Sequence, residues 1–452
     1  MNLETSDPAS AVAAPRARPL RWWSRAAVLS TGSALIAGAG LLASTDLHGI
    51  PTPQATAPIV PAPPIAQRMR LADETPGPAN AIEGAYRGSP ESRLISIYQA
   101  IAANRTDAAI DAAAALTRDV PAFRLGQLVY ADLLSARRGN EPRMAALARG
   151  DERDAELVQL RDEAVMRLKA LRERPPVDRV PAEFVMLPKA VHHALLVDTS
   201  RARIYLFQNG AQGLKLVSDH YVSVGKQGVD KAVEGDQRTP LGVYFVSDRV
   251  AQGALEARFG AGALQLNYPN AFDRLHGRTG SGIYVHGVPT DTYSRPPHDS
   301  DGCVVMANDE LLALMATIPV HDTPVVITRQ VHWVTDDAAK ARRKEILDAV
   351  VHWQGARSAH DSRALEAFYV DGARPVVPAA PIAARNARAA RPRPPEPVAF
   401  ADLSVMGWSE AHDTMVVTFR EHGTRSGRDS VLRQYWARQD RRWAIVAEGQ
   451  VR

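Results

Sequence analysis

The sequence predicts a multidomain α+β protein with an N-terminal helical region, a mainly β central region, and a C-terminal region of helices followed by antiparallel strands. The chain has 452 residues, of which 45% are apolar, so it can bury two or three separate cores. Apolar residues recur at helical spacing before residue 180, and they alternate as in strands after residue 194. Proline-rich stretches at 51–67 and 374–398 interrupt both patterns.

The first 88 residues have the pattern of an export signal followed by a linker. Four arginines lie in a basic, cytoplasmic segment at 1–25, before an uncharged run at 26–45. That run has the length of a signal peptide or of a membrane anchor, and both outcomes stay open because its cleavage motif is indistinct. Residues 46–88 form a stiff, proline-rich linker. The remainder is therefore expected in the periplasm, secreted, or anchored to the inner membrane.

Residues 89–180 are expected to be helical. Apolar positions in this region follow helical spacing, with breaks at Asn104 and before Pro121, which predicts three short antiparallel helices. A further helix is expected to end before Pro175. Alanine alternates with large aliphatic residues in a way that weakly resembles tetratricopeptide hairpins, although no repeat period can be counted. Structural packing is the expected role, with docking of a protein partner as the alternative.

Residues 185–330 have the alternation of β-strands, separated by glycine and proline turns. Asn209-Gly210 is a strong hairpin signal between two of these runs. One clear helix is expected at 308–317, with Asn308 as its cap. The glycine-rich stretch at 277–282 precedes a strand rather than a helix, which excludes a dinucleotide-binding fingerprint. The strand-like runs lie at 194–210, 214–225, 239–248, 264–270, 281–287 and 323–329.

Residues 338–452 form a separate region. Ile346, Val350 and Trp353 recur at helical spacing, and a proline-, alanine- and arginine-rich insertion at 374–398 cannot build a core. Helices followed by a curved antiparallel sheet resemble the NTF2-like cone fold, which implies a binding or assembly module. The four expected strands lie at 400–408, 413–422, 430–439 and 442–451.

Cys303 is the only cysteine in the chain. In an oxidising compartment cysteines usually occur in pairs, and a lone cysteine cannot form an internal disulfide. It follows Gly302 in a turn before the expected helix, whose N-terminal dipole would favour a thiolate. His286 ends a strand in which Tyr284 and His286 share one face, so His286 is a candidate base for the thiol.

Two other interpretations of these residues stay open. A lone cysteine is most often a small, buried apolar residue. His286, His298 and Cys303 could instead bind zinc, although their spacing matches no zinc finger or ribbon. We predict no metal and no cofactor. The net charge is only +4, with arginine concentrated near both ends, so nucleic acid is not an expected partner.

Two separated motifs resemble the YkuD-type L,D-transpeptidases, the cysteine enzymes that remodel bacterial peptidoglycan. The sequences "IYVHG" at 283–287 and "SDGCVVMAND" at 300–309 are similar to the family's HG and SxGC signature. Upstream, "EGDQRTPLGVYFV" at 234–246 is similar to the strand and turn that precede the family's active site. The resemblance covers roughly 190–330 and implies that residues 185–330 are the catalytic domain.

The resemblance implies roles for individual residues. Cys303 would be the nucleophile and His286 the general base, with the imidazole oriented by the backbone carbonyl of Gly287. Backbone N–H groups of Gly302 and Cys303 would bind the oxyanion. Attack on a tetrapeptide stem would release the terminal D-alanine and leave a thioester on the cysteine.

The substrate groove is expected to include residues from both motifs. Arg238 is the candidate for binding a carboxylate of the stem peptide. Asp301 and Val305 stand where many family members have histidine and arginine or asparagine, and the charge of Asp301 would raise the pKa of the Cys303 thiol. A subset of the family with S-D-G-C is more similar, and it includes enzymes that cut a lipoprotein off peptidoglycan. The expected groove residues are Tyr284, Ser300, Asp301, Arg238 and Thr239.

The predicted function is that of a peptidoglycan L,D-transpeptidase in cell-wall remodelling and cell shape. The acyl group would pass to an amine, which gives a 3-3 cross-link or exchanges a D-amino acid. A cysteine amidohydrolase that cleaves peptidoglycan-linked lipoprotein or stem peptides is the alternative, as is a wall-binding scaffold without activity. Expected partners are peptidoglycan stem peptides, the inner membrane if residues 26–45 anchor the chain, and a protein held by the helical or C-terminal region.

Overall fold

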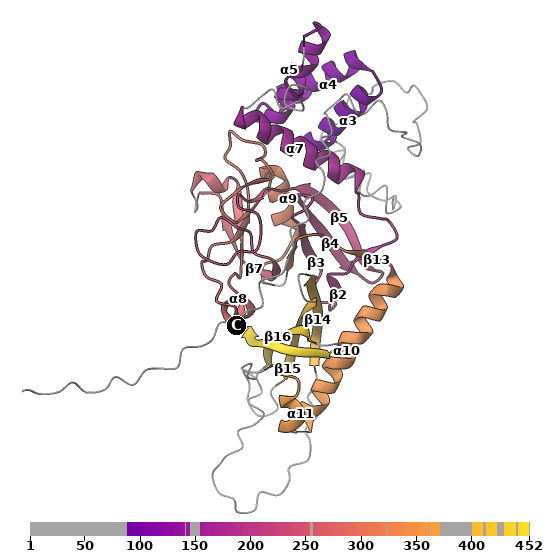
Figure 1. Cartoon of the computed structure of the whole chain (residues 1–452), viewed down its shortest axis with the longest axis vertical. Helices are drawn as coiled ribbons and strands as arrows, with labels where there is room; N and C mark the ends of the chain where they lie inside the picture. The colour runs from indigo at the N-terminus through magenta and orange to yellow at the C-terminus, as the bar shows by residue number, and fades with distance from the viewer. Residues whose placement is uncertain are drawn as a thin grey trace, which may run out of the picture. The chain divides into compact units, whose positions relative to one another are not determined.

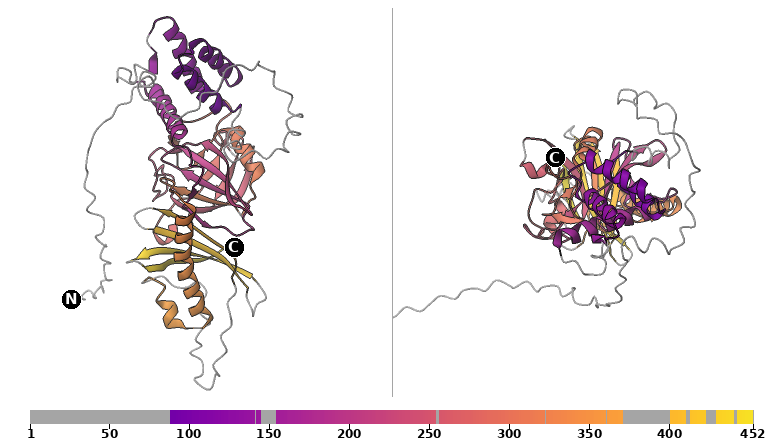
Figure 2. Two further views of the ribbon diagram at one scale, coloured as in Figure 1. Left: turned by 90° about the vertical axis from the view of Figure 1, so that its right-hand side faces the viewer. Right: turned by 90° about the horizontal axis from the view of Figure 1, so that it is seen from above.

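The structure is a computed structural model, shown in Figures 1 and 2. The expected cytoplasmic segment, the signal or anchor, all of the linker but its last residue, and the insertion at 374–398 lie outside the described residues. Among the helices that are described, none is long and apolar enough to cross a membrane. The described residues are 88–140, 142–144, 154–253, 256–321, 323–359, 361–370, 400–409, 413–422, 429–439 and 442–451.

Four helices make up most of the N-terminal region, and their bounds agree with the predicted breaks. Ser89 caps the first, because its side chain accepts a hydrogen bond from the N–H of Ser92. Leu94, Leu116 and Phe123 are fully buried where the first three helices pack together. The tetratricopeptide-like resemblance stays a prediction. The helices are α3 (Pro90–Ala102), α4 (Thr106–Asp119), α5 (Arg124–Arg137) and α7 (Ala155–Arg172).

An eight-stranded mixed sheet forms the central region. Strand β11 runs parallel to β9 and β12 runs parallel to β3, whereas the other neighbours are antiparallel. The predicted strands are therefore present, and they form one sheet that also includes the short strand β11. In spatial order the strands are β11 (Val304–Val305), β9 (Tyr284–His286), β8 (Gly262–Leu266), β7 (Gly242–Ala251), β12 (Pro324–Thr328), β3 (His193–Asp198), β4 (Arg203–Gly210) and β5 (Gly213–Tyr221).

Short elements complete the central region, and only β6, at the end of the predicted run 214–225, was expected. Strand β6 (Val224–Gly225) pairs in parallel with β10 (His298–Ser300), just before the cysteine turn. Strand β1 (Val180–Pro181) pairs with β13 (Trp333–Val334) at the other end of the region. A 3-10 turn at Ala257–Phe259 and the helix α8 (Ala271–Leu275) lie in the connections.

Helix α9 (Asn308–Thr317) begins where predicted, but the prediction that Asn308 caps it is wrong. The Asn308 side chain accepts hydrogen bonds from the N–H groups of Ala261, at 2.9 Å, and Val288, at 3.1 Å, and donates to the Val288 carbonyl at 2.8 Å. A Cβ atom on Gly287 would lie 2.1 Å from this side-chain oxygen. Long-range hydrogen bonds have thus replaced local capping, and they fix the loop that follows His286.

The C-terminal region combines two helices with a four-stranded antiparallel meander, as predicted (Figures 1 and 2). Helix α10 packs Ile346, Val350 and Trp353 into a core shared with the sheet. Strand β2 (Phe184–Met186) adds an unpredicted fifth strand beside β14. The NTF2-like identity stays a prediction. The elements are α10 (Asp336–Ser358), α11 (Ser362–Glu366), β14 (Phe400–Ser409), β15 (Asp413–His422), β16 (Asp429–Gln439) and β17 (Arg442–Val451).

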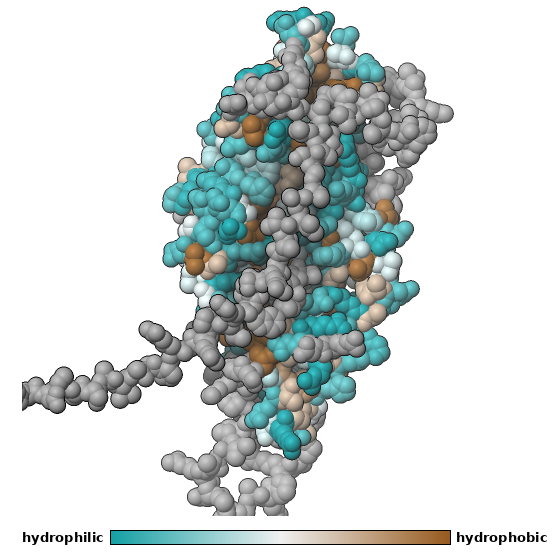
Figure 3. All heavy atoms as spheres, in the orientation of Figure 1, coloured by the Kyte–Doolittle hydropathy of each residue, from teal (hydrophilic) through white to brown (hydrophobic). Residues whose placement is uncertain are grey.

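The apolar cores lie inside these layers. On the face drawn in Figure 3, hydrophilic side chains predominate and apolar ones are scattered among them. Large apolar side chains such as Trp353, Trp436 and Tyr244 are completely or almost completely removed from solvent. Burial of such side chains is the main favourable contribution to folding.

A buried ion-pair network joins the helical region to the central sheet. Glu91 of α3 accepts hydrogen bonds from Arg167 of α7, at 2.8 Å, and from Arg203 of β4, at 2.7 Å. Arg167 also binds Glu163 at 2.7 Å, and all four side chains are buried. Burial alone would raise the pKa of Glu91, but the guanidinium groups of Arg203 and Arg167 lower it to about 2.

Replacing Glu91 with glutamine is expected to destabilise the protein by about 3–5 kcal/mol, because two buried guanidinium groups lose a shared carboxylate. Unfolding in urea, followed by circular dichroism, measures the difference. The pKa of Glu91 is lower in the folded state, so its stabilising effect is present above about pH 4.5 and is lost as the pH falls towards 2.

The matched control is Arg124→Ala, which breaks the exposed ion pair between Arg124 and Glu156. This control is expected to change the free energy of unfolding by about 0.5 kcal/mol or less. Equal effects of the two substitutions at pH 7 would contradict a stabilising role for the buried network.

Candidate active site

The His286 imidazole is held in one orientation at the end of β9. Its Nδ1 atom lies 2.7 Å from the carbonyl oxygen of Gly287, and its ring packs on Phe259 with 4.7 Å between centroids. A carbonyl oxygen can only accept a hydrogen bond, so Nδ1 carries the proton and Nε2 keeps its lone pair. The Gly287 carbonyl therefore contacts the imidazole as the resemblance implies, and the acceptor nitrogen is Nε2.

Burial sets the charge state of His286. The side chain is 5% exposed, and this loss of solvent is the largest cause that lowers its pKa, which falls to about 4. The hydrogen bond to Gly287 opposes this change, while the positive charges of Arg295 and Arg258 add to it. The imidazole is therefore neutral at pH 7 and able to accept a proton.

Strand pairing brings the turn that holds Cys303 alongside the strand that ends at His286. In the parallel pair β11–β9, Val305 is opposite His286 and Val304 is opposite Val285. Cys303 lies in the turn just before β11, and its sulfur contacts the carbonyl of Gly282, two residues before β9 begins. The pairing thus brings the cysteine turn alongside the strand that ends at His286.

The Cys303 thiol is neutral in the resting protein, contrary to the thiolate that the nearby helix predicted. Burial is the largest cause that raises its pKa, and the Asp301 carboxylate raises it further. The N–H of Tyr284 and the two arginines near His286 act in the opposite direction without reversing the result. The thiol donates to the Gly282 carbonyl, with 3.6 Å between sulfur and oxygen.

The cysteine turn requires glycine at position 302. Gly302 has a φ of +127°, and a Cβ atom there would lie 2.7 Å from the Arg238 carbonyl oxygen. A side chain would therefore push the two sequence motifs apart. Ser300 braces the same turn, because its hydroxyl donates to the Cys303 carbonyl at 2.6 Å and accepts from the Gly302 N–H at 3.1 Å.

The hydrogen bond to Ser300 bears on the expected oxyanion donors. Since the Gly302 N–H is already bonded to Ser300, it would have to be released before it could bind an oxyanion. The N–H of Tyr284 points at the sulfur and is a donor that the sequence did not indicate. The Tyr284 ring packs edge-on against Phe259, with 5.5 Å between centroids.

The remaining predicted groove residues make contacts within the protein. Arg238 donates to the Val229 carbonyl at 2.9 Å, and the buried Thr239 hydroxyl accepts from the Gly225 N–H at 2.9 Å. These two residues support the loop behind the cysteine turn. The Asp301 carboxylate is exposed and lies 3.3 Å from the Lys226 ammonium group.

Two arginines near the Cys–His pair, Arg258 and Arg295, were not among the predicted residues. Both lower the pKa of His286 and that of Cys303. Arg295 lies in the loop between the two halves of the motif, which is the sequence signal that could have identified it. Among the residues that the structure describes, no cluster of three or more His, Cys, Asp or Glu side chains could hold a metal.

Alkylation of Cys303 by iodoacetamide is expected to accelerate continuously through pH 9, because the pKa of the buried thiol is raised. Mass spectrometry assigns the product to this residue, since the chain has no other cysteine. Asp301→Asn removes a charge that raises the pKa, so its rate curve is expected to shift to lower pH. A rate plateau between pH 5 and 8 would instead indicate a preformed thiolate–imidazolium pair.

Residues 192–327 match the family model described as YkuD, L,D-transpeptidase catalytic domain. No curated protein matches the sequence. Among solved structures, Bd1075 of Bdellovibrio bacteriovorus is 21% identical, with 61% of this chain and 99% of that chain covered and a TM-score of 0.49. The helical cell shape determining protein Pgp2 of Campylobacter jejuni is 16% identical, with 64% and 100% covered and a TM-score of 0.46.

These structural likenesses are too low to carry an inference about the chain. The family match is more specific, because it spans Cys303, His286 and every other predicted site residue. It covers under a third of the 452 residues and includes neither the helical region nor the C-terminal region. The central region, at residues 192–327, therefore carries a YkuD-type L,D-transpeptidase catalytic domain.

Proposed function

We propose that the protein is a peptidoglycan L,D-transpeptidase in which Cys303 is the nucleophile and His286 the general base. The observation that carries the proposal is the parallel pairing of β9 and β11, which brings the turn that holds Cys303 beside the strand that ends at His286. The match of residues 192–327 to the family supports a stem peptide of peptidoglycan as the substrate. Export to the periplasm and a binding role for the NTF2-like region belong to the same proposal.

Acylation starts from the neutral pair. As the Cys303 sulfur attacks the carbonyl carbon of the stem peptide, Nε2 of His286 takes the thiol proton. The carbonyl oxygen becomes an oxyanion, for which the N–H groups of Cys303 and Tyr284 are candidate donors. Collapse of this intermediate breaks the amide bond, forms the thioester and expels the amine of the terminal D-alanine.

The low pKa of His286 suits the second half of this step. An imidazolium with a pKa of about 4 is a strong acid for a side chain, so it readily returns its proton to the departing amine. Gly287 keeps Nδ1 occupied, so the same Nε2 atom both receives and returns the proton.

The second step runs in reverse with a new acceptor. The acceptor amine attacks the thioester carbonyl, His286 takes its proton, and the thiol leaves with the proton returned to sulfur. A diaminopimelate amine gives a 3-3 cross-link and a D-amino acid gives exchange. Water gives a tripeptide, which is the hydrolase alternative retained from the S-D-G-C motif.

The proposal is tested by incubating the full-length protein with disaccharide tetrapeptide and analysing products by mass spectrometry. A cross-linked dimer, an exchanged stem or a tripeptide identifies the acceptor. Cys303→Ala is expected to abolish turnover, and His286→Ala to lower kcat by about 10²–10⁴-fold. Arg124→Ala, with its exposed side chain on α5, is the control and should retain wild-type rates.

Two results would contradict the proposed function. Turnover that persists in Cys303→Ala would show that another group is the nucleophile. A wild-type protein that releases no product and forms no adduct with a carbapenem at Cys303 would favour the inactive scaffold.

A further inference from the structure

Arg295 has a long, positively charged side chain in the loop between the two halves of the motif, and no carboxylate of the described residues forms an ion pair with it. Its guanidinium contacts only backbone carbonyl groups at the limit of hydrogen bonding, those of Asp299 at 3.4 Å and Arg258 at 3.5 Å. Among the ion pairs of the described residues, none includes Arg295. A part-buried guanidinium that lacks a carboxylate can take one from a ligand.

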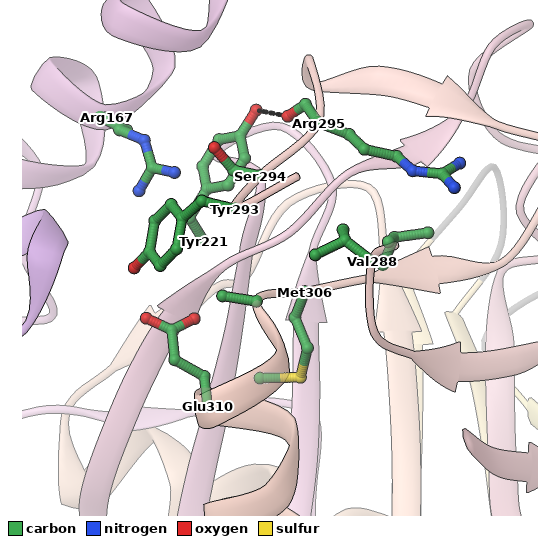
Figure 4. A pocket seen from close by; sticks show the side chains of 10 residues that line it. Arg167, Tyr221, Val288, Tyr293, Ser294, Arg295, Met306 and Glu310 are labelled. Atoms are coloured by element: carbon green, nitrogen blue, oxygen red, sulfur yellow. Dashed lines mark hydrogen bonds between the residues drawn. The ribbon is translucent and has the colours of Figure 1, made fainter. Parts of the chain in front are cut away.

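The backbone around Arg295 is fixed from three sides. The Tyr221 hydroxyl donates to the Arg295 carbonyl at 3.0 Å, the dashed line in Figure 4. Ser294 donates to Glu163 of the helical region at 2.7 Å, and the Pro297 carbonyl accepts from Val224 of β6. The position of this arginine is therefore built into the fold.

The direction of the side chain leaves Glu310, the acidic residue that lines the same pocket, unpaired with Arg295. Figure 4 shows the Arg295 guanidinium extending away from Glu310 and from Tyr221, on the far side of Val288. Glu310 itself lies 3.6 Å from the His220 imidazole. The positive charge of Arg295 is thus available to a molecule outside the pocket drawn there.

Arg258 extends the same positively charged surface. Its guanidinium lies 5.0 Å from the Phe259 ring centre, and that ring packs against His286. Arg258 forms an ion pair with Glu256 in which both side chains are exposed to solvent, so a ligand can compete for the guanidinium. Arg295 contacts the same segment, because its guanidinium donates to the Arg258 carbonyl at 3.5 Å, and the charges of both arginines lower the pKa of the imidazole and of the thiol.

The chemistry of the proposed reaction brings a carboxylate to the same place. The departing D-alanine carries a carboxylate one carbon from the amine that leaves Cys303. An entering D-amino acid, or the D-centre of diaminopimelate, carries a carboxylate at the same distance from the amine that attacks. The leaving group and the acceptor therefore both carry an α-carboxylate next to the reacting amine, and one binding site could recognise either of them.

We propose that Arg295, assisted by Arg258, binds the α-carboxylate next to the amine that leaves or enters at Cys303. The inference rests on the proposed function and replaces Arg238, whose guanidinium donates to the Val229 carbonyl, as the carboxylate-binding residue. It makes a free D-amino acid terminus a requirement for both half-reactions.

The first test does not depend on turnover. Cys303 in the full-length protein is alkylated with iodoacetate or with its neutral isostere iodoacetamide, and both rates are divided by those of free cysteine. Wild type is expected to favour iodoacetate by about threefold to tenfold, because a charge-assisted contact attracts the carboxylate. Arg295→Gln should remove most of this preference and Arg258→Gln part of it.

Arg124→Gln is the matched control, since it removes an equal charge from an exposed site on α5. If Arg295→Gln and wild type had the same ratio of iodoacetate to iodoacetamide alkylation rates, the proposal would be overturned. Arg295→Lys keeps the positive charge but lacks the planar guanidinium, which can donate two parallel hydrogen bonds to a carboxylate. This variant is expected to retain part of the preference for iodoacetate. Circular dichroism excludes misfolding as the cause of any loss, and the ratio of the two alkylation rates cancels the rise in the Cys303 pKa that follows from removing the Arg295 charge.

The second test uses the tetrapeptide with a free C-terminal carboxylate and the same peptide as its C-terminal amide. Wild type is expected to favour the free acid by about tenfold or more in kcat/KM, mainly through KM. Arg295→Gln should lose that preference, with Arg295→Lys intermediate. Equal use of acid and amide by the wild type would overturn the carboxylate site.

The two tests separate the inference from the proposed function. Turnover that depends on Cys303 but ignores the carboxylate would contradict only the arginine site. An iodoacetate preference that depends on Arg295, in a protein that turns over no stem peptide, would contradict only the transpeptidase.

Discussion

The close approach of Gly302 to the Arg238 carbonyl is the constraint on which the site depends. A Cβ atom there would come within 2.7 Å of that oxygen, so only glycine lets the cysteine turn lie against the loop of the upstream motif. From this turn the chain enters β11, which pairs in parallel with β9, the strand that ends at His286. The two motifs are thus one packed unit, although Arg238 and Gly302 are 64 positions apart in sequence.

Burial then determines how this unit can work. It lowers the pKa of His286 to about 4 and raises that of Cys303, so the resting pair is neutral and charge develops only during attack. Oriented donors and nearby positive charge are therefore most effective in the transition state. The loop that carries Arg295 supplies such charge, and its anchor on Glu163 gives the helical region a part in shaping the site.

Local sequence signals predicted most of the elements and singled out Cys303 and His286, whose catalytic roles stay a proposal. Helical spacing located α10, and alternation located β14 to β17, because one face of each is buried in the same core. The pairing of β2 with β14 was not predictable, since three residues carry too little pattern. Asn308 was predicted to cap a helix because asparagine is a common cap residue. Its hydrogen bonds to Ala261 and Val288 join segments that are distant in sequence, so local sequence patterns do not indicate them. Arg295 was missed for the same reason, as its importance lies in spatial neighbours.

The acyl-enzyme provides the decisive measurement. Full-length protein is mixed with tetrapeptide stem, quenched in acid within seconds, and analysed by intact-mass and peptide-mapping mass spectrometry. We predict an added mass equal to the stem without its terminal D-alanine, located on Cys303 and lost on treatment with hydroxylamine. The same adduct on another residue, or its persistence in Cys303→Ala, would contradict a mechanism built on the Cys303–His286 pair.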